Sequence, residues 1–151
     1  MSTSGLESIE CSVQLTHIWI NDLDVRLGWH NKQRSYRRLR AVLQALRDWL
    51  PIDEAAHLGA QLPQLLRGVY YEHWGPAITP ARADFVARID DSFEADPLRS
   101  TVDEITTVLG FLAEKLEAGE IKKVQHSLPA DVRALWPAPP QAAWPVPEEG
   151  L

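Results

Sequence analysis

The chain has 151 residues, 45% of them hydrophobic, which is enough to bury the core of one domain of ordinary size. Its net charge is −6, with the acidic excess in the second half, and its single cysteine fits a reducing compartment, so the composition argues against an internal disulfide and against a protein that coats nucleic acid. No apolar run approaches the ~18 residues of a membrane span, and the polar N-terminus lacks the pattern of a signal peptide, so we expect a cytoplasmic protein that does not enter a membrane.

The first predicted helix covers about residues 14–28. Large apolar side chains recur there at the spacing of one helical face, and they are Trp19, Ile20, Leu23 and Leu27. We expect the polar residues before this helix, 1–13, to form a flexible N-terminus.

Three more helices follow in the first half of the chain. The second, about 32–49, has an apolar face formed by Tyr36, Leu39, Val42, Leu43, Leu46 and Leu50. The third, about 53–61, ends at the Leu62-Pro63 step, because proline disfavours helical geometry in the residue before it and suits the first turn of the next helix. The fourth therefore covers about 63–72.

The same pattern returns 66 residues later, since residues 82–136 align with residues 16–70 without a gap. The identical pairs are Val42/Val108, Leu43/Leu109, Leu46/Leu112, Leu50/Leu116, Glu54/Glu120, Leu62/Leu128, Pro63/Pro129 and Arg67/Arg133. A helix after Thr79-Pro80 places Phe85, Val86, Ile89 and Phe93 on one face, and further helices are expected at about 98–116, 119–127 and 129–136.

These elements predict an all-α fold with a single helical domain over 14–136. We expect two tandem four-helix repeats, about 14–74 and 80–136, that pack about a pseudo-twofold axis and give about eight helices, because neither half alone covers its apolar faces. Residues 137–151 contain five prolines and are expected to form an extended tail.

Four strings carry a resemblance to a known family: HIWINDL (17–23), YRRLRAVLQALRDWLP (36–51), DEAAHLGAQLP (53–63) and RGVYYEHW (67–74). Through them the chain resembles the domain-of-unknown-function 2267 family of bacterial proteins. The resemblance covers the repeated region, about 15–136. It implies an all-helical, internally duplicated domain whose biochemical role is uncharacterised, and it brings no established catalytic residues.

A glutamate and an arginine recur thirteen residues apart in both halves, as Glu54 with Arg67 and as Glu120 with Arg133. Most other polar positions differ between the halves. We therefore expect each pair to form a partly buried salt bridge that fixes the angle between the third and fourth helices of its repeat.

The second predicted helix begins with the basic segment KQRSYRRLR, in which Arg34, Arg37 and Arg38 share one helical surface. Asp103 and Glu104 stand at the positions that match Arg37 and Arg38 in the second half. Opposite charges at matching positions favour a solvated face, or a contact between copies or within the fold. A protein partner and the phosphates of nucleic acid or a nucleotide are the weaker alternatives for this surface.

An aromatic corner ends the first repeat. Tyr70 aligns with Trp136, which favours a place in the core for both. Tyr71, His73 and Trp74 have no such match, so they are candidates for a partner-binding site, the alternative being that they cover the core at a helix end.

Glu54 and His57 form Glu-x-x-His, the spacing used in carboxylate-bridged di-iron bundles. Lys123 stands at the position that matches His57 and would repel a metal ion. The chain also lacks the sequence motifs of common hydrolases, nucleotide-binding loops and zinc enzymes. We therefore expect no metal, no cofactor and no catalytic residues.

The sequence favours a non-enzymatic protein-interaction or adaptor module, which binds another protein or itself. A small-ligand, nucleotide or nucleic-acid binding protein that uses the basic segment 32–40 is the alternative. A metal-dependent enzyme that uses Glu54 and His57 is the weakest.

Overall fold

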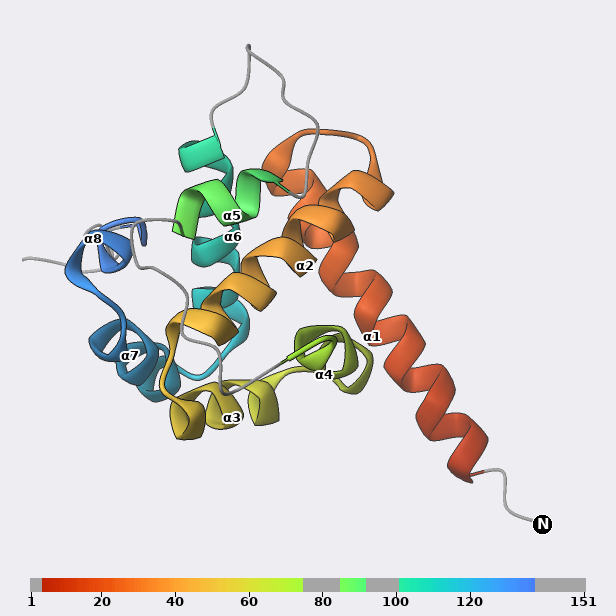
Figure 1. Ribbon diagram of the computed structural model, residues 1–151. Coiled ribbons are helices and arrows are strands. Elements are labelled where there is room, and N and C mark those ends of the chain that lie inside the picture. Colours follow the sequence, from red (N-terminus) through yellow and green to blue (C-terminus); the bar gives the residue numbers. More distant parts are fainter. Residues whose placement is uncertain (1–3, 75–84, 92–100, 138–151) are drawn as a thin grey trace, which may run out of the picture.

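The computed structural model describes residues 4–74, 85–91 and 101–137, and within them it contains eight helices and no strand. This confirms the all-α prediction. In chain order the helices are α1 (Ser4–Leu27), α2 (Lys32–Trp49), α3 (Ile52–Gln61), α4 (Gln64–Tyr71), α5 (Phe85–Asp91), α6 (Thr101–Lys115), α7 (Ala118–Ser127) and α8 (Ala130–Arg133) (Figure 1).

Local signals place most helix ends where the sequence predicted them. The side chain of Asn31 accepts a hydrogen bond from the backbone N–H of Arg34 and so caps the start of α2. Pro63 and Pro129 precede α4 and α8, and Leu62 and Leu128 before them are extended. The last predicted helix is shorter than expected, since α8 ends at Arg133 and turns lead on to Trp136.

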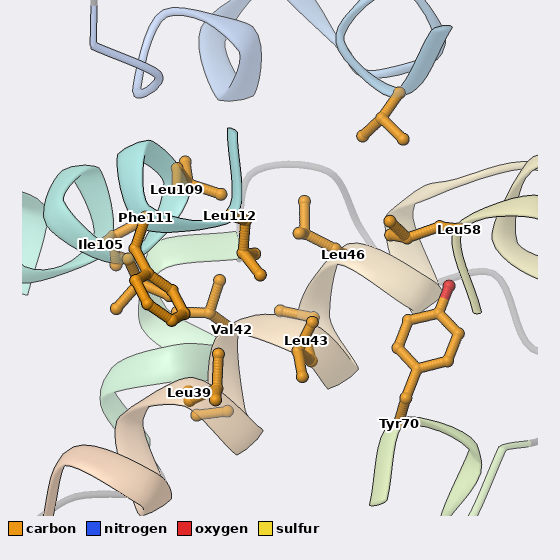
Figure 2. Close-up of a cluster of buried hydrophobic side chains, with 14 of the residues drawn as sticks. Leu39, Val42, Leu43, Leu46, Leu58, Tyr70, Ile105, Leu109, Phe111 and Leu112 are labelled. Atoms are coloured by element: carbon orange, nitrogen blue, oxygen red, sulfur yellow. The ribbon is translucent and has the colours of Figure 1, made fainter. Parts of the chain in front are cut away.

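The core forms where the apolar face of α2 packs against α6, while α3 packs against α7. Figure 2 shows Leu43 and Leu46 of α2 between two groups of side chains, with Ile105, Leu109, Phe111 and Leu112 of α6 on one side and Leu58 and Tyr70 on the other. All of these side chains are buried. Fully burying one such side chain contributes roughly 1.5–3 kcal/mol, so this layer supplies much of the stability of the fold.

The two halves of the chain also cross over each other, because α1 packs on α6 and α5 packs on α2. An edge-to-face aromatic pair lies at each crossing, Trp19 with Phe111 at 5.6 Å between ring centroids and Trp49 with Phe85 at 5.3 Å. Such pairs add about 0.5–1.5 kcal/mol beyond the area that they bury. Neither half of the chain therefore has a complete core of its own.

Ion pairs border the same crossings. Lys115 of α6 lies 2.6 Å from Asp22 of α1, and Arg88 of α5 pairs with Asp48 of α2. These partly exposed pairs add little stability each, but they fix the register of one helix against the other.

Several features recur at an offset of 66 residues. The bounds of α3 and α7 differ by 66 at both ends, as do the last residues of α2 and α6 and the first residues of α4 and α8. Buried Tyr70 also has buried Trp136 as its counterpart, which confirms that both belong to the core.

The structure corrects the first helix. The sequence predicted a helix from about residue 14 after a flexible segment, 1–13, whereas α1 already begins at Ser4. The prediction placed the start where the large apolar face begins, but Leu6, Ile9 and Val13 keep a helical spacing further back. Figure 1 shows these first turns of α1 running away from the other helices.

Some predicted core positions differ. Val102 is 45% exposed at the start of α6, and Ile20, Leu27, Tyr36 and Val86 are half-buried. Phe93, Thr79-Pro80, residues 98–100 and the tail beyond Pro137 lie outside the described residues.

Candidate interaction site

Exposed apolar side chains gather on one helix. Nine large hydrophobic side chains are exposed in the described part of the chain, and six of them belong to α1: Leu6, Ile9, Val13, Leu15, Ile18 and Val25. A helix that is apolar on several faces is normally buried. The surface of α1 is therefore the strongest candidate for a contact with another molecule.

The first three of these side chains form a defined pattern, which we name the arm stripe: Leu6, Ile9 and Val13. Steps of three and four residues continue it through Thr16 to the later positions Ile20, Leu23 and Leu27 of the same helix. In the second half of α1, Leu23 is fully buried, Leu27 packs against the core and Ile20 is half-buried. The arm stripe thus extends the packed face of α1 into a region where no described helix covers it.

The arm is acidic. Glu7 and Glu10 are exposed, and the first Lys or Arg in the sequence is Arg26. Arg26 in turn lies 2.5 Å from Glu114 of α6.

The basic segment of α2 does not form the predicted three-arginine surface. Arg38 is only 2% exposed, and its Nη2 lies 2.6 Å from Oε1 of Glu104. Its Nη1 also donates to the backbone carbonyl of Ile89 at 3.2 Å. The prediction of Arg38 as a partner-binding residue is wrong, because helix α6 brings the matching glutamate against it within the fold.

Arg34 and Arg37 remain nearer the surface. The guanidinium of Arg34 lies over the ring of Trp29 at 5.1 Å, a cation–π contact that ties it to the turn before α2. Arg37 is exposed. Because Arg38 is buried, only Arg34 and Arg37 of the three predicted arginines lie near the surface.

The aromatic corner is mainly structural. The rings of Tyr70 and Tyr71 lie 5.0 Å apart, those of Tyr71 and Trp74 lie 5.4 Å apart, and both Tyr71 and Trp74 pack against the core. The Tyr71 ring also lies against Gly59, where a Cβ would come within 2.5 Å of the tyrosine Oη. Among the predicted residues of this corner, His73 is the most exposed, and it has a left-handed backbone with φ of 61°.

The predicted salt bridges have other partners. Arg67 donates to the backbone carbonyls at the end of α3, with Nε 3.0 Å from the Gly59 oxygen and Nη2 3.1 Å from the Leu62 oxygen. Arg133 makes the equivalent bonds at the end of α7, to Gln125 and Leu128. Each arginine therefore caps a helix, because unpaired carbonyls and the negative end of the helix dipole attract its guanidinium there.

The two glutamates meet each other instead. Glu54 and Glu120 lie at the α3–α7 contact, close enough for their carboxyl groups to share a hydrogen bond. Burial, that hydrogen bond and the nearby charge of Glu54 raise the pKa of Glu120 to about 7. The prediction of Glu54–Arg67 and Glu120–Arg133 salt bridges is wrong, because the carboxyl groups face one another across the contact while the arginines reach the helix ends.

A comparison with protein families now adds to this geometry. The model of the family described as "Uncharacterized conserved protein (DUF2267)" matches residues 16–135. The chain belongs to the DUF2267 family. No curated protein matches it.

The match begins at residue 16, so the arm stripe of this DUF2267 protein precedes the matched residues. The buried Arg38–Glu104 pair, the Glu54–Glu120 pair and both capping arginines lie within the match.

The Glu-x-x-His motif of this DUF2267 domain lies on α3, where His57 Nδ1 is 4.0 Å from Glu54 Oε1 and His57 is exposed. Among the described residues, no group of three or more His, Cys, Asp or Glu side chains could hold a metal ion. No helix in the described part of the chain is long and apolar enough to cross a membrane.

Sequence reasoning missed two features of this DUF2267 protein. Buried Arg47 donates from Nη1 to the carbonyls of Tyr70 and Glu72 and so caps α4. Its counterpart at the 66-residue offset is Ala113. This difference between the two halves was the one sign in the sequence that Arg47 has a role of its own. The arm stripe was missed because it precedes the aligned repeats, although its heptad spacing was visible in the sequence.

Proposed function

We propose that this protein is a non-enzymatic protein-binding module whose contact element is α1. The observation that carries the proposal is the concentration of exposed apolar side chains on this one helix, with the arm stripe lying beyond the body. Contiguous exposed apolar surface on a small domain typically marks an interaction site. An exposed cysteine, Cys11, on the same helix is compatible with work in the reducing cytoplasm.

We also propose that the scaffold is a tandem four-helix repeat about a pseudo-twofold axis. Its support lies in contacts between matching residues, Arg38 with Glu104 and Glu54 with Glu120, since a twofold axis brings equivalent positions face to face. The identical capping pattern of Arg67 and Arg133 adds to it.

The alternative of a nucleotide or nucleic-acid site along the start of α2 has lost support. A phosphate-binding surface needs several accessible cations. Arg38, one of the three arginines predicted for this surface, is buried against Glu104.

The proposal is tested by quantitative affinity capture from the lysate of the native cells, with the full chain as bait. The Ile9→Gln variant removes one apolar side chain from the arm stripe, and Ile52→Gln is a matched control, because Ile9 and Ile52 are 59% and 58% exposed. We expect at least one stoichiometric protein to be retained by the wild type and by Ile52→Gln and lost with Ile9→Gln. Identical sets of captured proteins from all three baits would contradict the proposal.

A further inference from the structure

We infer that the arm stripe docks a helix that carries its own apolar stripe flanked by Lys or Arg. This inference rests on the proposed function and names the chemistry of the partner. It follows from the spacing of the stripe, from the charges beside it and from the faces that α1 already uses.

The spacing indicates a helical partner. Leu6, Ile9 and Val13 occupy alternating a and d positions of a heptad, and the same register continues into the part of α1 that packs on α2, α4 and α6. Within the body, therefore, this face of α1 already packs against helices. A partner helix that lies along the arm extends that mode of packing beyond the body.

The charges indicate a basic partner. Glu7 and Glu10 each follow an arm-stripe residue by one position, so the rotation of about 100° per residue places both on the same side of the stripe. No Lys or Arg precedes Arg26, so the arm carries no basic side chain of its own that could neutralise them. Cationic side chains along one edge of a docked helix complement this flank.

The same charges disfavour two other occupants. If two arms paired in antiparallel fashion through the stripe, the Glu10 side chains of both copies would face each other without a cation between them. Helices that lie on membranes carry Lys and Arg on the polar face, whereas the charged residues among 4–15 are Glu7 and Glu10. A second copy and a lipid surface are therefore outcomes against which the inference is tested.

The test uses two designed helical peptides of about 21 residues, or three heptads. Both have leucine at a and d, and one has lysine at e and g where the other has glutamate. Binding of each labelled peptide to the full chain is measured by fluorescence anisotropy at low ionic strength. We expect the lysine peptide to bind at least about ten-fold more tightly than the glutamate peptide, and this preference to shrink as salt screens the charges.

Variants of the chain locate the binding. Ile9→Gln should lower the affinity of the chain for the lysine peptide at least about five-fold, whereas Ile52→Gln should leave that affinity unchanged. Glu7→Lys with Glu10→Lys should reverse the preference in favour of the glutamate peptide. All four positions are exposed, so the helical circular dichroism and the unfolding midpoint of each variant should match those of the wild type.

Several results would overturn the inference. Equal affinity for both peptides, or no binding of the lysine peptide, would do so. So would an affinity for the lysine peptide that does not change with Ile9→Gln or with the charge reversal. A dimer in analytical ultracentrifugation that Ile9→Gln abolishes would show that a second copy is the occupant. Stronger binding to phosphatidylcholine vesicles than to the lysine peptide would also overturn it. If captured proteins still depend on Ile9 while the peptides show no preference, the partner chemistry is wrong and the proposed function stands; if no captured protein depends on Ile9, the proposed function fails.

Discussion

Arg38 and Glu104 occupy matching positions in the two halves of the chain, 66 residues apart, and their side chains meet at 2.6 Å in the interior. The contact joins α2 to α6 at the centre of the domain. Taking two charges out of water is costly, and the mutual attraction of the pair and the added hydrogen bond to Ile89 offset that cost.

Removing one member of this pair should be strongly destabilising. Arg38→Met removes the guanidinium that pairs with the buried Glu104 carboxylate, and we expect a loss of about 3–5 kcal/mol in the free energy of unfolding. The double variant with Glu104→Leu removes both charges of the pair and should recover most of this loss, to within about 1–2 kcal/mol of the wild type, because no buried charge of the pair is then left uncompensated. Urea denaturation of the three proteins measures both values. A double variant no more stable than Arg38→Met would contradict this account.

The close contact at Gly59 gives a second prediction. A Cβ at this position would lie 2.5 Å from Tyr71 Oη and 3.0 Å from Tyr70 Cε2, so Gly59→Ala should cost about 1–3 kcal/mol through overpacking. Gly68 of α4 is the matched control, because nothing lies within 4 Å of its added Cβ and alanine there should stabilise the helix by about 0.5–1 kcal/mol. Thermal unfolding of both variants tests the contrast, and an equal gain in stability from Gly59→Ala and Gly68→Ala would exclude the contact.

The carboxyl pair predicts a pH dependence. The pKa of Glu120 is raised in the folded state to about 7 by burial and by Glu54, so between its ordinary value and pH about 7 the folded chain holds a proton that the unfolded chain releases. The contribution of this group to stability is therefore lost as pH rises through that window. Glu120→Gln stays neutral at every pH, so its urea midpoint should fall less between about pH 5 and pH 8 than that of the wild type. If the urea midpoints of the two proteins changed with pH in parallel, Glu120 would not titrate in this range.

The capping arginine can be separated from the predicted salt bridge by a double-mutant cycle. Arg67→Ala removes the donors to the end of α3 and should cost about 1–2 kcal/mol. Because Glu54 faces Glu120 rather than Arg67, the coupling energy between Arg67→Ala and Glu54→Ala should be within about 0.5 kcal/mol of zero. A coupling energy above about 1 kcal/mol would instead show that Arg67 and Glu54 form the predicted salt bridge.

The apolar pattern of this chain predicted the helices well, since α2 begins at Lys32 and ends at Trp49 as expected and Tyr70 and Trp136 are both buried. Periodicity reports which face of a helix is buried, and proline reports where a helix ends. Charged partners were not predictable in the same way. Arg38 and Arg67 carry the same side chain, but one meets a carboxylate and the other meets carbonyls, and only the packing of α6 and the end of α3 decides which.

The candidate site was predicted least well. The sequence directed attention to Arg38 and Trp74, which the fold uses internally, and overlooked Leu6, Ile9 and Val13. An apolar stripe in a sequence looks the same whether or not another helix covers it, so exposure could be recognised only once the body was in place.

A contact between the arm stripe and another protein can be detected directly by crosslinking. The most direct measurement places a photo-reactive amino acid at position 9 of the full chain in its native cells, with position 52 as the matched site of equal exposure. We predict a discrete covalent adduct with another protein from position 9 that is absent from position 52. No adduct at position 9, or the same adducts from both positions, would contradict the proposed contact.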